Sequence, residues 1–225
     1  MSKKTFSWSR PWKSDRYVGL YSPYRESSAN YLYNLLFCDD LTLFKNPDET
    51  AQDSALWSTL LAEQPDFEAL EKTASNVEEE SRLRVLAYNR LRADGRAVPD
   101  KQLLGVIVEV PLQQGLDTLA AYADGRVRYL NQADKAAIIE DGAPEVEALA
   151  RELVAASQGL VNKIGPWEKK RLAPPKPGNV RITFLVSDGL YFGEGPFEAL
   201  QQDAMGGPIL AKAAQLLQAV VNAAV

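Results

Sequence analysis

The dipeptide Asp124-Gly125 constrains the fold of this chain more than any other local feature. Two-residue loops of this composition favour the type I′ turn, whose twist matches that of two antiparallel strands. The flanking segments, 116–123 and 126–132, are therefore predicted to form a β-hairpin. The segment before them, Leu103 to Val110, is almost entirely apolar and rich in β-branched residues, as is typical of a central strand.

The rest of the C-terminal half predicts a mixture of strands and helices. Residues 136–139 form a short strand, and a helix then opens at Pro144 and stops before Gly165-Pro166. The final helix begins at Pro208 and has a broad apolar face. We expect that face to lie in the core, and the alternative is a homodimer formed through this C-terminal helix.

A second strand pair is predicted at 180–186 and 190–192. In the first of these segments apolar residues alternate with Arg181 and Thr183, which predicts a strand with one buried face. The intervening Ser187-Asp188-Gly189 is typical of a turn.

The sequence before residue 95 has a helical pattern. Helices are expected from Ser27-Ser28, after Asp48, and from Asn76 as an N-cap to Gly95 as a stop. We therefore predict two parts: residues 1–98, an aromatic and basic segment followed by a helical region, and residues 99–225, the sheet domain. One continuous domain is the alternative.

These elements together predict an α+β fold with a mostly antiparallel sheet flanked by helices. In element order alone, the C-terminal half resembles profilin-like and roadblock-like folds. That resemblance implies a sheet with helices packed alongside. No motif matches those families residue by residue, so we assign no family.

Histidine is absent from the 225 residues, and Cys38 is the single cysteine. Nucleophile systems that use imidazole, and zinc sites built from histidine or several thiolates, therefore cannot form within one chain. We expect no metal, no cofactor and no intrachain disulfide, and a non-catalytic role is favoured. The lone cysteine and the absence of a signal-peptide pattern or a membrane-spanning pattern predict a cytoplasmic protein.

Charge is unevenly distributed along the chain. Residues 1–25 and 163–181 are basic, residues 39–80 are strongly acidic, and the formal net charge is −5. An acidic total disfavours binding to nucleic acid or to an anionic membrane. We expect the basic segments to neutralise the acidic region within the same fold. The alternative is that Trp8, Trp12 and Trp167 in these segments stack on the bases of a nucleic acid or on the aromatic rings of a partner.

The Pro- and Lys-rich connector between residues 166 and 178 is the leading candidate for a recognition surface. Its prolines restrict the backbone, which lowers the entropic cost of binding. The candidate contact residues are aromatic or basic: Trp167, Lys169, Lys170, Arg171, Trp8 and Trp12. The favoured function is thus a protein-interaction or regulatory module with a protein partner, and the alternative is that the connector is only a stiff linker.

A glycine-rich stretch at 187–195 gives a second functional hypothesis. If this stretch lines a pocket, its polar groups are Asp188, Tyr191 and Glu194. They would serve a small-ligand-binding protein or an enzyme that uses carboxylate or tyrosine chemistry, with Asp188 and Glu194 as an acid/base pair. The ordinary alternative is that the glycines satisfy turn geometry.

Overall fold

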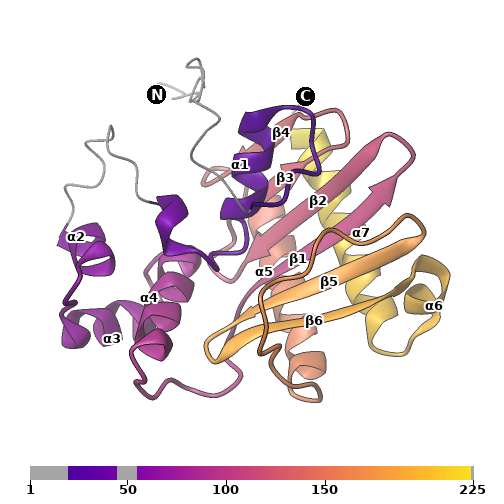
Figure 1. Cartoon of the computed structure of the whole chain (residues 1–225). Helices are drawn as coiled ribbons and strands as arrows, with labels where there is room; N and C mark the ends of the chain where they lie inside the picture. Colours follow the sequence, from indigo (N-terminus) through magenta and orange to yellow (C-terminus); the bar gives the residue numbers. More distant parts are fainter. Residues whose placement is uncertain (1–19, 45–54, 224–225) are drawn as a thin grey trace.

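The computed structural model describes residues 20–44 and 55–223. Its centre is an antiparallel sheet of six strands in the order β4-β3-β2-β1-β5-β6 (Figure 1). The strands are β1 (Leu103–Leu112), β2 (Gly115–Tyr122), β3 (Val127–Leu130), β4 (Ala136–Ile139), β5 (Asn179–Val186) and β6 (Gly189–Pro196). The α+β class with helices flanking an antiparallel sheet is confirmed.

Helices cover both faces of the sheet. In the described residues the α-helices are α1 (Ser27–Leu35), α2 (Ala55–Leu61), α3 (Phe67–Ser75), α4 (Ser81–Ala93), α5 (Pro144–Val161), α6 (Phe197–Gln202) and α7 (Gly206–Ala223). Helices α5 and α7 lie behind the sheet in Figure 1, whereas α1 lies in front of it. We call these two sides the α5/α7 face and the α1 face. Helices α2, α3 and α4 pack together at one end of the α1 face.

Strand β1 has core on both sides because its side chains alternate between the faces. Val106 and Val108 join the core under α5 and α7, whereas Ile107 joins the core of the α1 face. Burial on both faces explains the nearly continuous apolar sequence of this strand. The core of the α1 face combines residues from both halves of the chain, such as Leu86 and Tyr122. The division into 1–98 and 99–225 stays a prediction.

The predicted hairpin forms, but its loop is longer than the two residues Asp124-Gly125. Strands β2 and β3 pair antiparallel, and the Tyr122 N–H donates to the Arg126 carbonyl, which leaves residues 123–125 as a three-residue loop. Gly125 has a φ of 97° and Asp124 does not have a positive φ, so the turn is not of type I′. Positive φ values are accessible to glycine without the steric cost that other residues incur. The predicted strand at 136–139 and the helix from Pro144 also form as expected.

Two further expectations are wrong. Asn76 does not open a helix: it caps the end of α3, and its N–H is bonded to the carbonyls of Lys72 and Thr73. Helix α4 starts at Ser81, after a turn. Strand β5 does not have a single buried face, because Arg181 and Thr183 are buried as well, on the α1 face.

Helix α7 buries its apolar side in the core behind the sheet. Ile209, Leu216 and Val220 are almost fully buried there, as expected for the core interpretation. Within the residues described, no helix combines the length and apolarity needed to cross a membrane.

Two strand glycines differ in their surroundings. Gly105 in β1 pairs with Tyr122, and a methyl group at Gly105 would lie 3.0 Å from Tyr122 Cδ1. At Gly193 in β6 a methyl group would have nothing within 4 Å. The Tyr122 ring thus occupies the space that a side chain at Gly105 would need.

We therefore expect Gly105→Ala to lower the free energy of unfolding by about 1–3 kcal/mol, the usual cost of overpacking. Gly193→Ala is the matched control and should leave that free energy unchanged, or raise it by up to about 1 kcal/mol. Urea denaturation of both variants measures this difference. Equal stabilities for the two variants would contradict the packing of Tyr122 on Gly105.

Candidate functional site

The connector, residues 166–178, runs across the α1 face in front of β5 and β6 (Figure 1). It begins at the edge of the sheet, where the N–H of Trp167 donates to the carbonyl of Leu190 at 2.7 Å. The Trp167 ring meets the Phe192 ring edge to face, with 5.2 Å between their centroids. The indole N–H donates to the carbonyl of Lys170 at 3.0 Å. Trp167 thus attaches the connector to β6.

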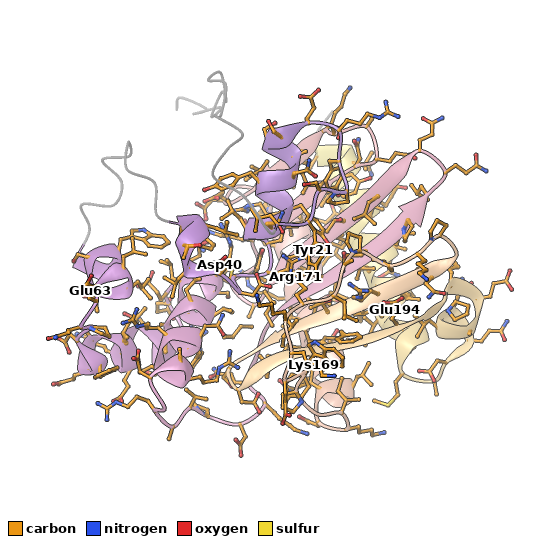
Figure 2. The ribbon with its side chains drawn as sticks, viewed as in Figure 1. Tyr21, Asp40, Glu63, Lys169, Arg171 and Glu194 are labelled. Atoms are coloured by element: carbon orange, nitrogen blue, oxygen red, sulfur yellow. The ribbon has the colours of Figure 1, made fainter. Side chains whose placement is uncertain are left out.

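Arg171 fixes the middle of the connector. Its guanidinium carbon lies 3.8 Å from the centroid of the Phe37 ring, and its Nε donates to Asp39 Oδ2 at 2.8 Å. Nη2 donates to Asn34 Oδ1 at 2.9 Å, and the Tyr21 hydroxyl donates to the Arg171 carbonyl at 2.6 Å. Figure 2 shows Tyr21 and Arg171 close together on the α1 face. With 7% of its side chain exposed, Arg171 contacts the chain itself.

A row of charged residues crosses the sheet on this face. Glu109 in β1, Arg181 in β5 and Glu194 in β6 are neighbours in register. Arg181 Nη2 lies 2.5 Å from Glu194 Oε2, whereas Arg181 Nη1 is 3.8 Å from Glu109 Oε2. The Tyr33 hydroxyl donates to Glu109 Oε1 at 2.6 Å.

Glu109 is completely buried, and its Oε2 atom accepts no hydrogen bond. Burial raises the pKa of the Glu109 carboxyl, against the opposing effects of the Tyr33 hydrogen bond, Arg181 and Arg171. Glu194 behaves differently: burial opposes its ionisation, but hydrogen bonds from Arg181 and Asn179 prevail and lower its pKa. Glu194 is therefore held as a carboxylate partner of Arg181.

The three pocket residues expected from the sequence do not converge. Asp188 and Tyr191 are together, since the Tyr191 hydroxyl donates to Asp188 Oδ2 at 2.8 Å. Burial and this carboxylate raise the pKa of Tyr191 to about 12. Glu194 lies six residues beyond Asp188, about 20 Å along an extended strand. The expected acid/base pair of Asp188 and Glu194 does not form.

A cavity of about 700 Å³ lies between α4, the connector and the turn that joins β5 to β6. Its lining includes Asn89 and Arg92 of α4, Asp188 of the turn, and four connector residues: Trp167, Lys169, Lys170 and Arg171. Residues of α1, the segments beside it and β5 also contribute to the lining. The connector and the glycine-rich turn, which the sequence presented as separate candidates, thus meet at one cavity.

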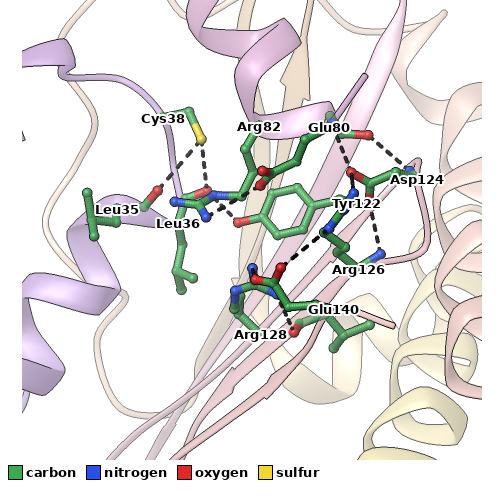
Figure 3. A network of polar contacts seen from close by, with 12 residues as sticks. Leu35, Leu36, Cys38, Glu80, Arg82, Tyr122, Asp124, Arg126, Arg128 and Glu140 are labelled. Carbon is green, nitrogen blue, oxygen red and sulfur yellow. Dashed lines mark hydrogen bonds and ion pairs between the residues drawn. The ribbon is translucent and has the colours of Figure 1, made fainter. Parts of the chain in front are cut away.

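A second polar cluster lies around Tyr122 and is structural (Figure 3). The Tyr122 hydroxyl donates to the Leu36 carbonyl at 2.9 Å, and Arg126 pairs with Asp124 at 3.1 Å. Arg128 pairs with Glu140 in the same cluster. The arginine pairs lie within the β2–β3 hairpin and between β3 and the segment after β4. The Tyr122 hydroxyl and Asp124, which accepts from the Ser81 N–H at 2.7 Å, join the hairpin to the helical layer.

Cys38 belongs to this cluster and is fully buried. Burial raises the pKa of its thiol to about 11, against the opposing effect of Arg82. A thiol of raised pKa is a poor nucleophile at neutral pH. Within the described residues, no group of three or more His, Cys, Asp or Glu side chains is placed to hold a metal ion.

Two predicted contact residues, Trp8 and Trp12, lie outside the described residues. Comparison with protein-family models gives no match, and comparison with curated protein sequences gives none either.

Sequence reasoning missed two residues of this region, Glu109 and Arg92. For Glu109 there was a signal: a lone acidic residue inside an apolar strand requires compensation when it is buried. Arg92 carried no such signal, because a basic residue near the end of a helix is ordinary.

The buried carboxyl of Glu109 makes stability depend on pH. The pKa of Glu109 is higher in the folded protein than its value of about 4.3 in the unfolded chain. Between these two pKa values the native state binds more protons than the unfolded chain. The free energy of unfolding therefore falls as pH rises through this range. Glu109→Gln keeps an acceptor for Tyr33 and removes this titration.

We expect the stability of the wild type relative to Glu109→Gln to decrease as pH rises from 4 towards the folded pKa. Urea denaturation across this range measures the difference, and Glu198→Gln on exposed α6 is the control. A stability difference independent of pH would show that Glu109 does not titrate differently on folding.

Proposed function

We propose that this protein is a non-catalytic interaction or regulatory module, and that the connector is its main contact surface. The observation that supports this is the contrast between anchored and exposed groups in one segment. Three groups of the connector are bonded to the rest of the fold: the Trp167 N–H, the Arg171 guanidinium and the Leu172 carbonyl. The Leu172 carbonyl accepts from Arg181 Nη1 at 3.3 Å. Lys169 and Lys170 are exposed.

A surface held in this way has an advantage in binding. Because the connector is already ordered, association loses less conformational entropy than it would with a free loop. Leu172 is 38% exposed beside the two lysines, and it offers an apolar contact with a basic rim. We infer that the partner is a protein with an acidic surface around an apolar depression, since complementary charge favours encounter and register.

We also propose a second contact surface, the basic and aromatic segment that contains Trp8 and Trp12. A cytoplasmic location and a homodimer through α7 are further proposals. A small-ligand function near Asp188 is the second candidate, and the cavity beside that residue favours it.

Affinity capture from the native cell lysate tests the interaction. The bait proteins are the wild type, the double variant Lys169→Glu/Lys170→Glu, the variant Leu172→Asp, and the control Lys135→Glu on the exposed β3–β4 turn. We expect one stoichiometric acidic protein with the wild type and the control, and its loss with both connector variants. Charge reversal at the rim should also slow association and reduce its salt dependence.

Identical recovery of the same proteins by all four baits would contradict the role of the connector. So would recovery of no protein by the wild type. The circular dichroism spectra of the variants must match that of the wild type, which separates loss of contact from loss of folding.

A further inference from the structure

Arg92 of α4 is a partly buried cation without an ion pair. Nη2 donates to Asn89 Oδ1, which is uncharged, and Nε is buried without a hydrogen-bond partner. Among the described residues, no carboxylate lies within 4.0 Å of its guanidinium. Burial lowers the pKa of Arg92, and Asp188 only partly offsets this effect. A partly desolvated guanidinium without a counter-charge favours the arrival of an anion.

The other charges of the cavity also leave positive groups available. Of its carboxylates, Asp39 is bound by Arg171 and Asp40 accepts from the N–H and the hydroxyl of Thr42. Asp188 accepts the Tyr191 hydroxyl at Oδ2, whereas its Oδ1 is buried without a hydrogen-bond partner. Glu168, Lys169 and Lys170 are exposed on the connector, and the Lys169 Nζ lies 5.6 Å from the centroid of the Trp167 ring. In the described residues neither of these lysines has a carboxylate within 4.0 Å.

The turn between β5 and β6 positions Arg92 at the end of the cavity. A methyl group at Gly189 would lie 3.2 Å from Arg92 Nη1 and 3.0 Å from Pro166 Cβ. Glycine at this position therefore lets the guanidinium and the start of the connector approach the turn closely. The buried side chain of Leu185 adds an apolar part to the lining.

We infer that this cavity binds a small molecule that carries an anionic carboxylate or phosphate group, with Arg92 as its charge partner. The volume of about 700 Å³ falls within the usual range for small-ligand sites. Lys169 and Lys170 of the connector also line the cavity and supply further positive charge. The apolar contacts of Leu185 accommodate the uncharged part of the ligand.

Titrations with two simple anions test this inference. Inorganic phosphate and succinate are each added to the full chain, and the backbone amide shifts are followed by NMR, with methylammonium chloride as a cationic control at equal ionic strength. We expect saturable shifts in residues 88–92 and 188–190 with at least one anion and none with methylammonium. The anion with the lower Kd identifies the preferred group as phosphate or carboxylate.

Two variants assign the binding to Arg92. Arg92→Gln should raise the Kd by about tenfold or more, as expected for loss of a charge-assisted hydrogen bond. Gly189→Ala should also raise the Kd by displacing the guanidinium. Arg90→Gln is the matched control on the same helix, where Arg90 is already paired with Asp94 at 2.8 Å, and its Kd should equal that of the wild type.

The absence of saturable shifts with both anions would overturn the inference. An unchanged Kd in Arg92→Gln, with a well-dispersed spectrum, would overturn it as well. Either result would leave the partner-binding proposal intact, because that proposal depends on Leu172 and on the exposed lysines and not on Arg92.

Discussion

The contact between the Arg171 guanidinium and the Phe37 ring fixes the connector on the α1 face. The connector forms no regular helix or strand, so few backbone hydrogen bonds fix its course. Arg171 compensates for this by stacking on an aromatic ring while its N–H groups bond Asp39 and Asn34. The planar guanidinium can make these contacts at once, and a lysine ammonium cannot reproduce that geometry.

The same cation also contributes to the electrostatics of the sheet. Glu109 is buried beneath this region, and both Arg181 and Arg171 stabilise its charged form. Removing one partner of a buried ion pair commonly lowers the free energy of unfolding by more than the intact pair contributes to it, because the remaining charge is left buried without compensation. Such pairs therefore couple the secondary-structure elements that carry them. Strands β1, β5 and β6 are coupled in this way through Glu109, Arg181 and Glu194. The cavity at the start of the connector follows from this arrangement, since Trp167 and Arg171 hold the segment at two points and the cavity lies between it and α4.

The sequence predicted those parts of the fold that depend on local signals. The hairpin around Asp124-Gly125 could be located because turn residues and the apolar segments beside them are properties of neighbouring residues. Its loop length could not be predicted from this dipeptide, since Asp-Gly occurs in three-residue loops as well. Asn76 was misassigned because the same residue type caps either end of a helix. The burial of Arg181 could not be predicted, since it depends on what covers the α1 face. Arg171 was expected to face a partner, yet its partner Asp39 is 132 positions away, and local patterns carry no information at that separation.

Hydrogen exchange of the connector in Arg171→Gln tests most directly whether this arginine orders the segment. We expect exchange in residues 165–173 to become faster in this variant and exchange in β1 and β2 to stay unchanged. Such a result would show a local release of the connector without global unfolding. Connector exchange that is equally slow in the variant and the wild type would contradict this role of Arg171, because the segment would then be ordered without its arginine.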